Sequence, residues 1–516
     1  MLKANLNLLE EISSARVWRS WLVICAFTFV VHCFTLRISP TVWQDEVQIV
    51  DMGRSVLSGA DSTWAVSWSL AGRPGQPLNY LGCVAQEAAY RLANGTSTGP
   101  RLVSLLGALL AATTLLGWLL QRGAKPWIAL LAGLLLVMDP LFAASFRGAR
   151  VDGMVFTCIF ACCWMIRRGV EPSASGSRSL LTWPAAGMFL ALAGLCWASA
   201  ILLVPLVVYE FIDSQRSQVA GGGFKRFLRD GLLVALGAAA TFALGLVPIW
   251  STLKTSVQDT SSAVSAVAST GFYLERLVQA ATCYKLSPWV LLLGVLAMLR
   301  LDGVLFLGAF FIALFGVLST RVYEHRALYL LPYLLLAIGS RANALAGVRN
   351  SRPGLAKASL CVLSLMVAWS AALTLGMRTW NAARQSRIRS YERVEEMASH
   401  ASIQAGASVY CLGWEFYYVG RALGWKQYHY LCGAKEGPDS AYSHFLSRMD
   451  YVLMPENYAN RSAVEELLKA EGFSFIRLLG TQTATASPGS SKPVIRVGAQ
   501  GYPRCRLYAN KALTRS

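Results

Sequence analysis

Residues 21–36 read WLVICAFTFVVHCFTL, and a short polar stretch, WQDEVQ at 43–48, follows them closely. The first stretch is long and apolar, has basic residues before it, and lacks a small-residue cleavage site after it. We therefore expect an uncleaved first membrane span rather than a signal peptide. Adjacent carboxylates beside a span are costly unless they are solvated or used. Asp45 and Glu46 are thus the first candidate site.

The composition is that of a membrane protein. The chain has 516 residues, of which 55% are hydrophobic and only 15% are charged, and its mean hydropathy is +0.44. In soluble domains about a quarter of the residues are charged. The net charge of +19 would suit a nucleic-acid-binding protein, but the basic residues cluster in short loops between apolar runs, as the positive-inside rule requires. We therefore expect membrane lipids as partners and no nucleic acid.

About eleven membrane spans are expected in all, several of them shorter than the ~20 residues that a perpendicular helix needs. Before the second span, two moderately apolar helices are expected near 47–57 and 77–92, and both are expected to lie on the membrane surface. With the N-terminus in the cytoplasm, most basic loops fall inside, and the polar stretch at 43–48 and the C-terminus fall outside. The later spans are expected near 101–120, 127–144, 153–166, 182–197, 199–212, 231–250, 288–299, 303–319, 328–340 and 358–376.

From about residue 378 the composition changes to that of a soluble domain. Short apolar strands and helices alternate there, which predicts a small α/β domain with a partly parallel sheet. The expected strands are 408–412, 451–454 and 473–479, and the expected helices are 384–400 and 463–470.

The predicted fold class is a polytopic α-helical membrane protein with a C-terminal α/β extracytoplasmic domain. The transmembrane domain covers residues 1–377 and includes the interfacial helices of the first outer loop, at about 45–92. The α/β domain covers residues 378–516.

Asp45 and Glu46 suit the transfer of a sugar from a phospholipid carrier. That reaction needs a base for the acceptor hydroxyl and cations for the departing phosphate. One carboxylate suffices as base, and the second can hydrogen-bond the acceptor or position its neighbour. The alternative is a solvated loop, or carboxylates that pair with Arg37 or Arg54. The place immediately after the first span favours the catalytic interpretation.

A second candidate stretch is Arg147 to Asp152, which lies at an outer helix end. Its two arginines depart from the positive-inside pattern, so they call for an explanation. Arg150 is suited to a phosphate or a sugar, with Asp152 orienting it. An Arg–Asp pair that caps the helix and reaches the interface explains the stretch equally well, so both interpretations stay open.

A third candidate stretch, RVYEHR at 321–326, precedes a late span. Arg321, His325 and Arg326 are suited to a lipid-linked phosphate at the outer leaflet. The alternative is interfacial anchoring by basic and aromatic residues. The scattered cysteines and histidines show no zinc-type spacing, so no metal site is expected from them. His32, inside the first span, is expected to be a packed or hydrogen-bonded core histidine.

Together these stretches resemble the polyprenyl-phosphate-sugar-dependent glycosyltransferases of the C superfamily. The nearest group is the dolichyl-phosphate-mannose protein mannosyltransferase-like proteins, which include the bacterial aminoarabinose transferase acting on lipid A. Asp45-Glu46 is similar to the family's acidic motif in the first loop, and the stretch from Pro140 to Asp152 is similar to its second outer loop. Glu324-His325-Arg326, leading into Leu330-Leu331-Pro332, resembles its late E-x-R-Y…LP segment.

The resemblance implies roles for individual residues. Asp45 would be the base, Glu46 its helper, and Arg326 with Arg321 the ligands of the carrier phosphate, beside His325. The remaining candidates for donor or acceptor binding are Glu324, Arg147, Arg150 and Asp152. Many members have a tyrosine where this chain has Ile49 and Ala327, so no particular member's substrate is carried over. Protein mannosyltransferase-like enzymes need no divalent ion, although other branches do, and no cofactor is expected here.

The function expected is that of an integral membrane glycosyltransferase. It would move a sugar, with inversion, from a polyprenyl-phosphate-sugar donor to an extracytoplasmic hydroxyl on a cell-envelope glycan, lipid or protein, in a bacterial inner membrane. One alternative is a transporter or flippase of lipid-linked sugars, which would place ionisable residues near mid-membrane. Others are an O-antigen-type polymerase or ligase and a non-catalytic assembly protein. The early Asp-Glu pair favours the glycosyltransferase.

Overall fold

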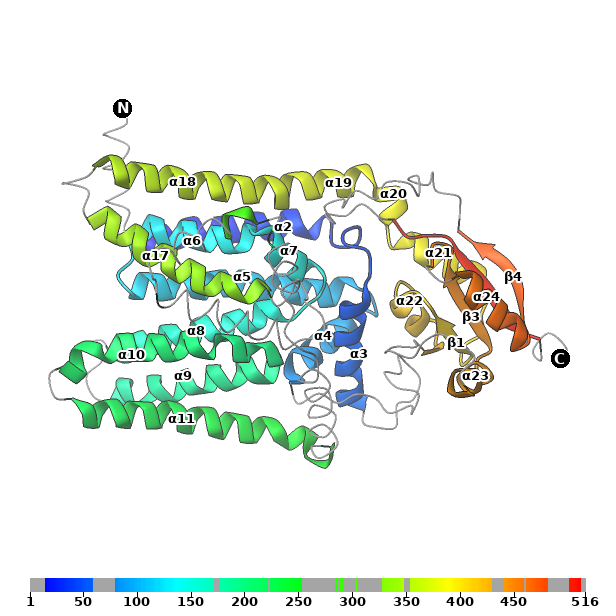
Figure 1. Ribbon diagram of the computed structural model, residues 1–516, viewed down its shortest axis with the longest axis horizontal. Helices are drawn as coiled ribbons and strands as arrows, with labels where there is room; N and C mark the ends of the chain where they lie inside the picture. Colours follow the sequence, from blue (N-terminus) through cyan, green and yellow to red (C-terminus); the bar gives the residue numbers. More distant parts are fainter. Residues whose placement is uncertain are drawn as a thin grey trace. The chain divides into compact units, whose positions relative to one another are not determined.

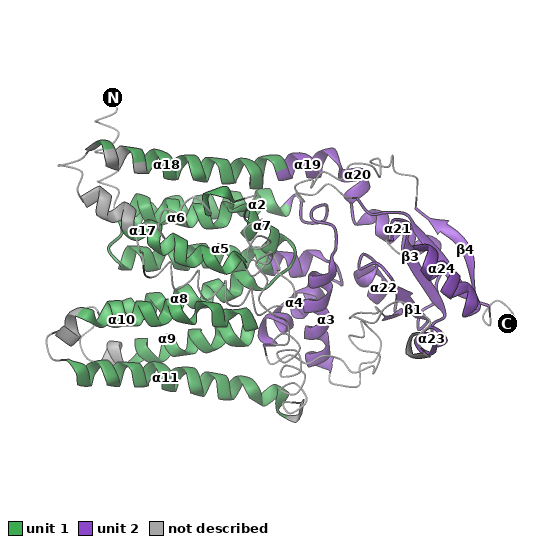
Figure 2. Cartoon of the chain, viewed as in Figure 1, with its two compact units in different colours: residues 1–33, 104–377 green, residues 34–103, 378–516 purple. Residues whose placement is uncertain are grey.

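The computed structural model describes residues 14–58, 79–170, 177–220, 223–252, 284, 287–290, 303, 327–347, 353–428, 440–458, 461–480 and 501–511. The chain divides into two compact units (Figure 2). Unit 1 contains residues 1–33 and 104–377, and unit 2 contains residues 34–103 and 378–516. The expected boundary after residue 377 is also a boundary between these units. The first outer loop, expected within the transmembrane domain, groups instead with the C-terminal residues.

All the secondary-structure elements described in unit 1 are helices (Figure 1). Six described helices are long and apolar enough to cross a membrane, or seven if α6 and α7 form one bent span. Most of the spans expected at 288–299 and 303–319 lies outside the described residues, so the total of about eleven stays a prediction. The elements are α2 (Ser14–Cys33), α5 (Thr98–Gln121), α6 (Pro126–Met138), α7 (Pro140–Arg147), α8 (Asp152–Val170), α9 (Ser177–Cys196), η1 (Ala198–Leu203), α10 (Val204–Ala220), α11 (Phe224–Leu246), η2 (Val247–Thr252), η4 (Leu328–Leu330), α17 (Leu331–Gly347), α18 (Pro353–Ala371) and η5 (Ala372–Met377).

The span expected at 127–144 is not one continuous helix, because the helix breaks at Asp139. α6 and α7 meet there at an angle of 55°. Pro140 has no N–H to donate and its ring would clash with a continuing helix. The Asp139 carboxylate accepts the N–H groups of Leu141, at 2.9 Å, and Phe142, at 3.0 Å, and so caps α7. Asp139 and Pro140 therefore determine the break, although the surrounding apolar run predicts one continuous helix.

Close helix packing in unit 1 depends on glycine. A Cβ atom on Gly187 of α9 would lie 1.9 Å from the Val234 carbonyl oxygen of α11, and one on Gly237 would lie 2.2 Å from that of Pro184. Small residues at such contacts let helix backbones approach closely, which is how helices associate in lipid. Gly187 and Gly237 therefore allow the backbones of α9 and α11 to pack in close contact.

A partly buried ion cluster joins the ends of α5, α8 and α10. Arg122 and Arg167 both donate to Glu210 and Asp213. Glu210 is fully buried, so two cations offset the cost of removing its charge from water. This end of the helices carries the loops that the positive-inside rule assigns to the cytoplasm.

Unit 2 contains a five-stranded sheet of order β2-β1-β3-β5-β4. β1 is parallel to β2 and β3, and β5 is antiparallel to β3 and β4. The elements are α3 (Gln44–Ser58), α4 (Leu81–Leu92), α19 (Arg378–Arg384), α20 (Ser386–Arg389), α21 (Glu392–Ala401), β1 (Ser408–Cys411), α22 (Tyr417–Ala422), β2 (Lys426–Tyr428), α23 (Ser440–Leu446), β3 (Tyr451–Pro455), α24 (Arg461–Ala470), β4 (Phe473–Leu479) and β5 (Cys505–Asn510).

The elements expected in unit 2 are found in most cases. The predicted helices of the first outer loop are α3 and α4, the predicted strands are β1, β3 and β4, and the helix at 463–470 is α24. The single helix expected at 384–400 is wrong. Arg384 ends α19, Gln385 precedes α20, and Ser390, which is extended with ψ of 135°, separates α20 from α21. The short strand β2 and the strand β5 were not predicted.

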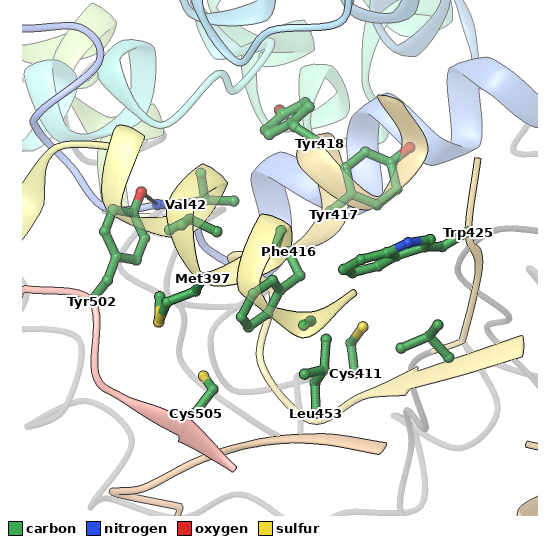
Figure 3. Packing of buried hydrophobic residues seen from close by; sticks show 14 of the residues in the cluster. Val42, Met397, Cys411, Phe416, Tyr417, Tyr418, Trp425, Leu453, Tyr502 and Cys505 are labelled. Carbon is green, nitrogen blue, oxygen red and sulfur yellow. Dashed lines mark hydrogen bonds between the residues drawn. The ribbon is translucent and has the colours of Figure 1, made fainter. Parts of the chain in front are cut away.

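One hydrophobic core joins the first outer loop to the sheet of unit 2. Val47 and Val50 of α3, together with Val42 and Tyr90, belong to the same buried cluster as residues from α21, α22 and the strands. Figure 3 shows the part of this cluster around Val42, Met397, Cys411, Phe416, Tyr417, Tyr418, Trp425, Leu453, Tyr502 and Cys505. Burial of this apolar surface is the main force that holds the loop in unit 2.

Candidate functional site

Asp45 is the second residue of α3 and lies in its first turn. The side chain is half-buried. The positive end of the helix dipole stabilises a carboxylate at this place. The segment before it is anchored at two points, because Arg101 donates to the Leu36 carbonyl oxygen and the Val42 N–H donates to Tyr502 Oη at 3.0 Å. Asp45 is thus presented on a rigid element, which a catalytic carboxylate requires.

Glu46, its neighbour, is buried in a hydrogen-bonded pair. Arg101 donates to both of its carboxylate oxygens, from Nε at 2.9 Å and from Nη2 at 2.8 Å. Tyr418 Oη donates a third bond at 3.1 Å. Burial, followed by the Glu46 charge, raises the pKa of Tyr418, so its hydroxyl stays protonated and donates. These contacts hold the first turn of α3, and the helper role that the resemblance implies for Glu46 stays a prediction.

A second buried ion pair joins α4 to α22. Arg421 donates to both carboxylate oxygens of Glu87, at 2.9 and 3.0 Å. Arg91 donates to the same carboxylate at 2.8 Å from a half-exposed position. The Arg421 guanidinium also lies 4.2 Å from the centre of the Tyr90 ring, a cation–π contact. The side chains of α22 therefore bind the first outer loop by charge as well as by packing.

Tyr417 extends this network to α3. Its hydroxyl accepts a bond from Arg421 at 2.9 Å and donates one to Asp51 Oδ1 at 3.2 Å. Arg54 donates to the same Asp51 oxygen at 2.8 Å. Burial raises the pKa of Asp51, and the neighbouring Arg54 opposes that shift. Asp51 lies six residues after Asp45 on α3, and its contacts help to hold the helix in place.

In unit 1 the predicted residues Arg150 and Asp152 form a buried ion pair. Arg150 Nε donates to Asp152 Oδ2 at 2.8 Å, and Ser145 donates to the same oxygen at 2.6 Å. Tyr329 donates to the other oxygen at 2.8 Å. Arg150 also lies over the ring of Trp197, 5.9 Å from its centre. The Arg–Asp pair weighed from the sequence is therefore present, and it ties the second outer loop to the segment that follows Arg326.

We expect Tyr329→Phe to lower the free energy of unfolding by about 1.5–3 kcal/mol, because the lost bond goes to a charged acceptor. Tyr333→Phe is the matched control, since its hydroxyl donates at 2.6 Å to the neutral carbonyl of Leu202, and we expect a loss of about 1 kcal/mol. Thermal unfolding of both variants in detergent measures the difference. Equal losses would show that Asp152 carries no charge there.

Arg147, also predicted, lies buried beside the first span. Its Nη1 donates to Nδ1 of His32 at 2.7 Å. His32 is buried, 1% exposed, and its ring meets that of Phe146 edge to face at 5.2 Å. His32 is thus the hydrogen-bonded core histidine that the sequence predicts. The role of Arg147 in donor or acceptor binding stays a prediction.

The remaining predicted residues, Arg321, Glu324, His325 and Arg326, lie outside the described residues. Their assignment to the carrier phosphate therefore stays a prediction. Within the described ranges, no three His, Cys, Asp or Glu side chains are grouped so as to hold a metal ion. The expectation that the reaction needs no metal stays untested.

The sequence interpretation missed the partners of the predicted carboxylates. Arg101 opens a span directly after the polar loop, and Glu87 has Arg91 four residues later, which is a recognisable ion-pair spacing. Tyr417 and Arg421 have the same spacing in the C-terminal region. None of these patterns names its distant partner, so Arg101–Glu46 and Arg421–Glu87 were not predicted.

Comparison with known proteins supports the resemblance. Residues 81–236 match the model of the family described as dolichyl-phosphate-mannose-protein mannosyltransferase. None of the curated proteins compared with it matches the chain.

Two solved structures of ArnT from Cupriavidus metallidurans have a similar fold. The apo structure has a TM-score of 0.58 at 14% identity, with 97% of this chain and 99% of that chain covered. The structure bound to undecaprenyl phosphate has a TM-score of 0.57 at 14% identity, with 95% and 98% covered.

Arabinofuranosyltransferase AftD from Mycobacteria has a TM-score of 0.50 at 13% identity, over 95% of this chain and 41% of that chain. At such low identities the likeness shows the fold alone. Together with the family match, it confirms the predicted resemblance to the C superfamily of glycosyltransferases.

Proposed function

From the fold of a C-superfamily glycosyltransferase, we propose that this membrane protein transfers a sugar from a polyprenyl-phosphate carrier to a hydroxyl group outside the cytoplasm. The observation that carries the proposal is Asp45, held at the first turn of α3 by a buried network, on a fold shared with ArnT over nearly the full length of both chains. That relative is described as bound to undecaprenyl phosphate, which supports a carrier of this class.

In the proposed reaction Asp45 acts as the general base. It takes the proton of the acceptor hydroxyl while the oxygen attacks the anomeric carbon. The bond from that carbon to the phosphate oxygen breaks, and its electron pair leaves with the polyprenyl phosphate. A single displacement of this kind inverts the anomeric configuration. Arg321, His325 and Arg326 are assigned to the developing phosphate charge, as cationic groups stabilise a departing oxyanion.

The network around Glu46 supports this assignment. A base must lie within hydrogen-bond reach of the proton it accepts, and small misplacements cost much of the rate. Arg101 and Tyr418 occupy both oxygens of Glu46, which fixes the helical turn that carries Asp45. We assign catalysis to Asp45 and positioning to Glu46. The proposed reaction requires no divalent ion.

The proposed setting is a bacterial inner membrane with about eleven spans. The N-terminus lies in the cytoplasm, and Asp45 and the C-terminal α/β region lie outside. The positive-inside pattern of the loops supports this orientation. The acceptor belongs to a cell-envelope glycan, a lipid or a protein.

The proposal is tested with the purified protein, a panel of polyprenyl-phosphate sugars and a membrane extract as the source of acceptor. We expect release of polyprenyl phosphate together with a glycosylated product of inverted anomeric configuration. Movement of the intact donor across a vesicle bilayer, with no carrier released, would support the transporter instead. Extension of a second lipid-linked glycan would support the polymerase alternative.

A further inference from the structure

Glu415 of unit 2 is a buried carboxyl group for which the described residues supply no ion pair. It lies between β1 and α22 and is 7% exposed. Its side-chain hydrogen-bond donor is the thiol of Cys505 in β5, with 3.7 Å between Sγ and Oε1. A thiol is a weak donor, and a carboxylate ion left in apolar surroundings without a cation is costly. Glu415 therefore calls for an explanation beyond packing.

The titratable groups that face Glu415 from the sheet are acids, which carry no charge while they are protonated. They are Cys411 of β1, Cys505 of β5 and Tyr502, which precedes β5, and all three belong to the buried cluster of Figure 3. Arg393 of α21 acts on the Cys505 thiol. Burial raises the pKa of Glu415, and hydrogen bonds from its own N–H and from Cys505 oppose this shift. The surroundings therefore favour the protonated carboxyl.

The turn that carries Glu415 is tightly packed and is joined to α22. A Cβ atom on Gly413 would lie 2.4 Å from both carboxyl oxygens of Glu415, so the glycine leaves room for this side chain. The Tyr391 hydroxyl of α21 donates to the main-chain carbonyl of Glu415 at 3.1 Å and accepts the N–H of Val419 at 3.0 Å. A charged Glu415 that turns toward water therefore displaces this turn and, with it, the start of α22.

The same helix holds α3. Tyr417, its first residue, donates from Oη to Asp51 at 3.2 Å. Tyr418 donates to Glu46 at 3.1 Å. Both tyrosines follow the turn closely in the chain, so a displacement of the turn withdraws their hydroxyls from α3, the helix that carries Asp45.

We propose that Glu415 is a pH-sensitive switch: its protonated carboxyl keeps α22 on the sheet and on α3, and its ionisation releases them. On ionisation the proton passes to water, and the carboxylate requires water or a cation that its buried position does not supply. In the proposed orientation this region lies outside the cytoplasm, so the switch responds to the pH of the surroundings. The helix that carries Asp45 is thus held firmly in acid and less firmly as the pH rises.

The stability of the purified full-length chain, measured by chemical denaturation against pH, tests the ionisation of Glu415. Because its pKa is higher in the folded state than the ordinary 4.5, the unfolded chain loses this proton first as the pH rises. Each pH unit between the two pKa values therefore shifts the unfolding equilibrium of the wild type about tenfold toward the unfolded chain. Glu415→Gln keeps the shape of the side chain and has no proton to lose. We expect its stability relative to the wild type to increase as the pH rises from about 5 to about 8.

The control is Glu466→Gln, which removes an exposed carboxyl from α24, and its stability difference from the wild type should not change with pH. A Glu415→Gln difference that stays constant, or that becomes a loss at higher pH, would show that the folded protein neutralises an ionised Glu415 and would overturn the proposal. If Glu415→Gln does not fold, Cys505→Ala takes its place. This variant removes the thiol donor that favours the ionised form, so its relative stability should fall as the pH rises, and a constant difference would again overturn the proposal.

Hydrogen–deuterium exchange tests the connection from Glu415 to α3. The exchange of the α3 amides is corrected for its intrinsic pH dependence, and α24 serves as the internal control. In the wild type we expect the protection of α3 to fall as the pH rises, by up to about tenfold per pH unit, and in Glu415→Gln to stay constant. An equal loss of protection in both proteins would overturn the switch. Neither measurement uses turnover, so failure of the transferase reaction and failure of the switch remain distinguishable.

Discussion

Arg101→Met is expected to lower the free energy of unfolding by about 3–5 kcal/mol, because it leaves the Glu46 carboxylate buried without its cation. Arg101 is 0% exposed and donates to both Glu46 oxygens and to the Leu36 carbonyl. Methionine keeps most of the side-chain volume, so the change removes charge and hydrogen bonds with little new cavity. Chemical denaturation monitored by tryptophan fluorescence measures the loss.

The double variant Arg101→Met/Glu46→Leu is the control for this prediction. Replacing both members of a buried ion pair by apolar residues is often nearly neutral, so we expect most of the lost stability to return. If the double variant is as unstable as the single one, Arg101 stabilises the fold through packing or through Leu36, and the pairing with Glu46 contributes little.

Arg421→Met is expected to cost a similar amount, about 3–5 kcal/mol. The Arg421 side chain is 7% exposed, and its guanidinium donates to both oxygens of Glu87, which is fully buried. The substitution also removes the cation–π contact between Arg421 and Tyr90. The substitution therefore weakens the attachment of α4 to α22, while the apolar cluster that the two helices share remains.

Arg91→Met is the matched control, because Arg91 donates to the same carboxylate from a side chain that is 50% exposed. Pairs with an exposed partner contribute about 0–1 kcal/mol. The two variants therefore remove the same kind of bond to the same acceptor and differ in burial. Comparable losses would mean that burial of Arg421 does not determine the strength of this contact.

Much of the fold is predictable from local patterns. Apolar runs locate α2, α5, α8 and α11, and alternation of short apolar strands with helices locates β1, β3, β4 and α24. The break at Asp139 is missed because the apolar run continues across a proline, although Asp139-Pro140 is itself a cap signal. The helix expected at 384–400 fails for a similar reason, because its apolar spacing continues through the extended residue Ser390.

The candidate site is predictable only in its first member. Asp45 is recognisable from two adjacent carboxylates after a span, but Tyr418, which binds Glu46, is 372 residues away in the chain. No periodicity or spacing rule relates residues so distant, since the fold alone brings them together. The same holds for Arg421 and Glu87. The contacts by which Glu46 holds α3 in place could therefore be found only from the structure.

The measurement that tests the account most directly compares the turnover of wild type and Asp45→Asn with a polyprenyl-phosphate sugar. Asparagine keeps the shape of the side chain but cannot accept the hydroxyl proton. We expect turnover to fall by about 100-fold or more, as removal of a general base predicts, with unchanged donor binding and a loss of stability of at most about 1 kcal/mol, since only the helix-dipole interaction is lost. Full activity in Asp45→Asn would contradict the assignment of the base, and with it the central claim.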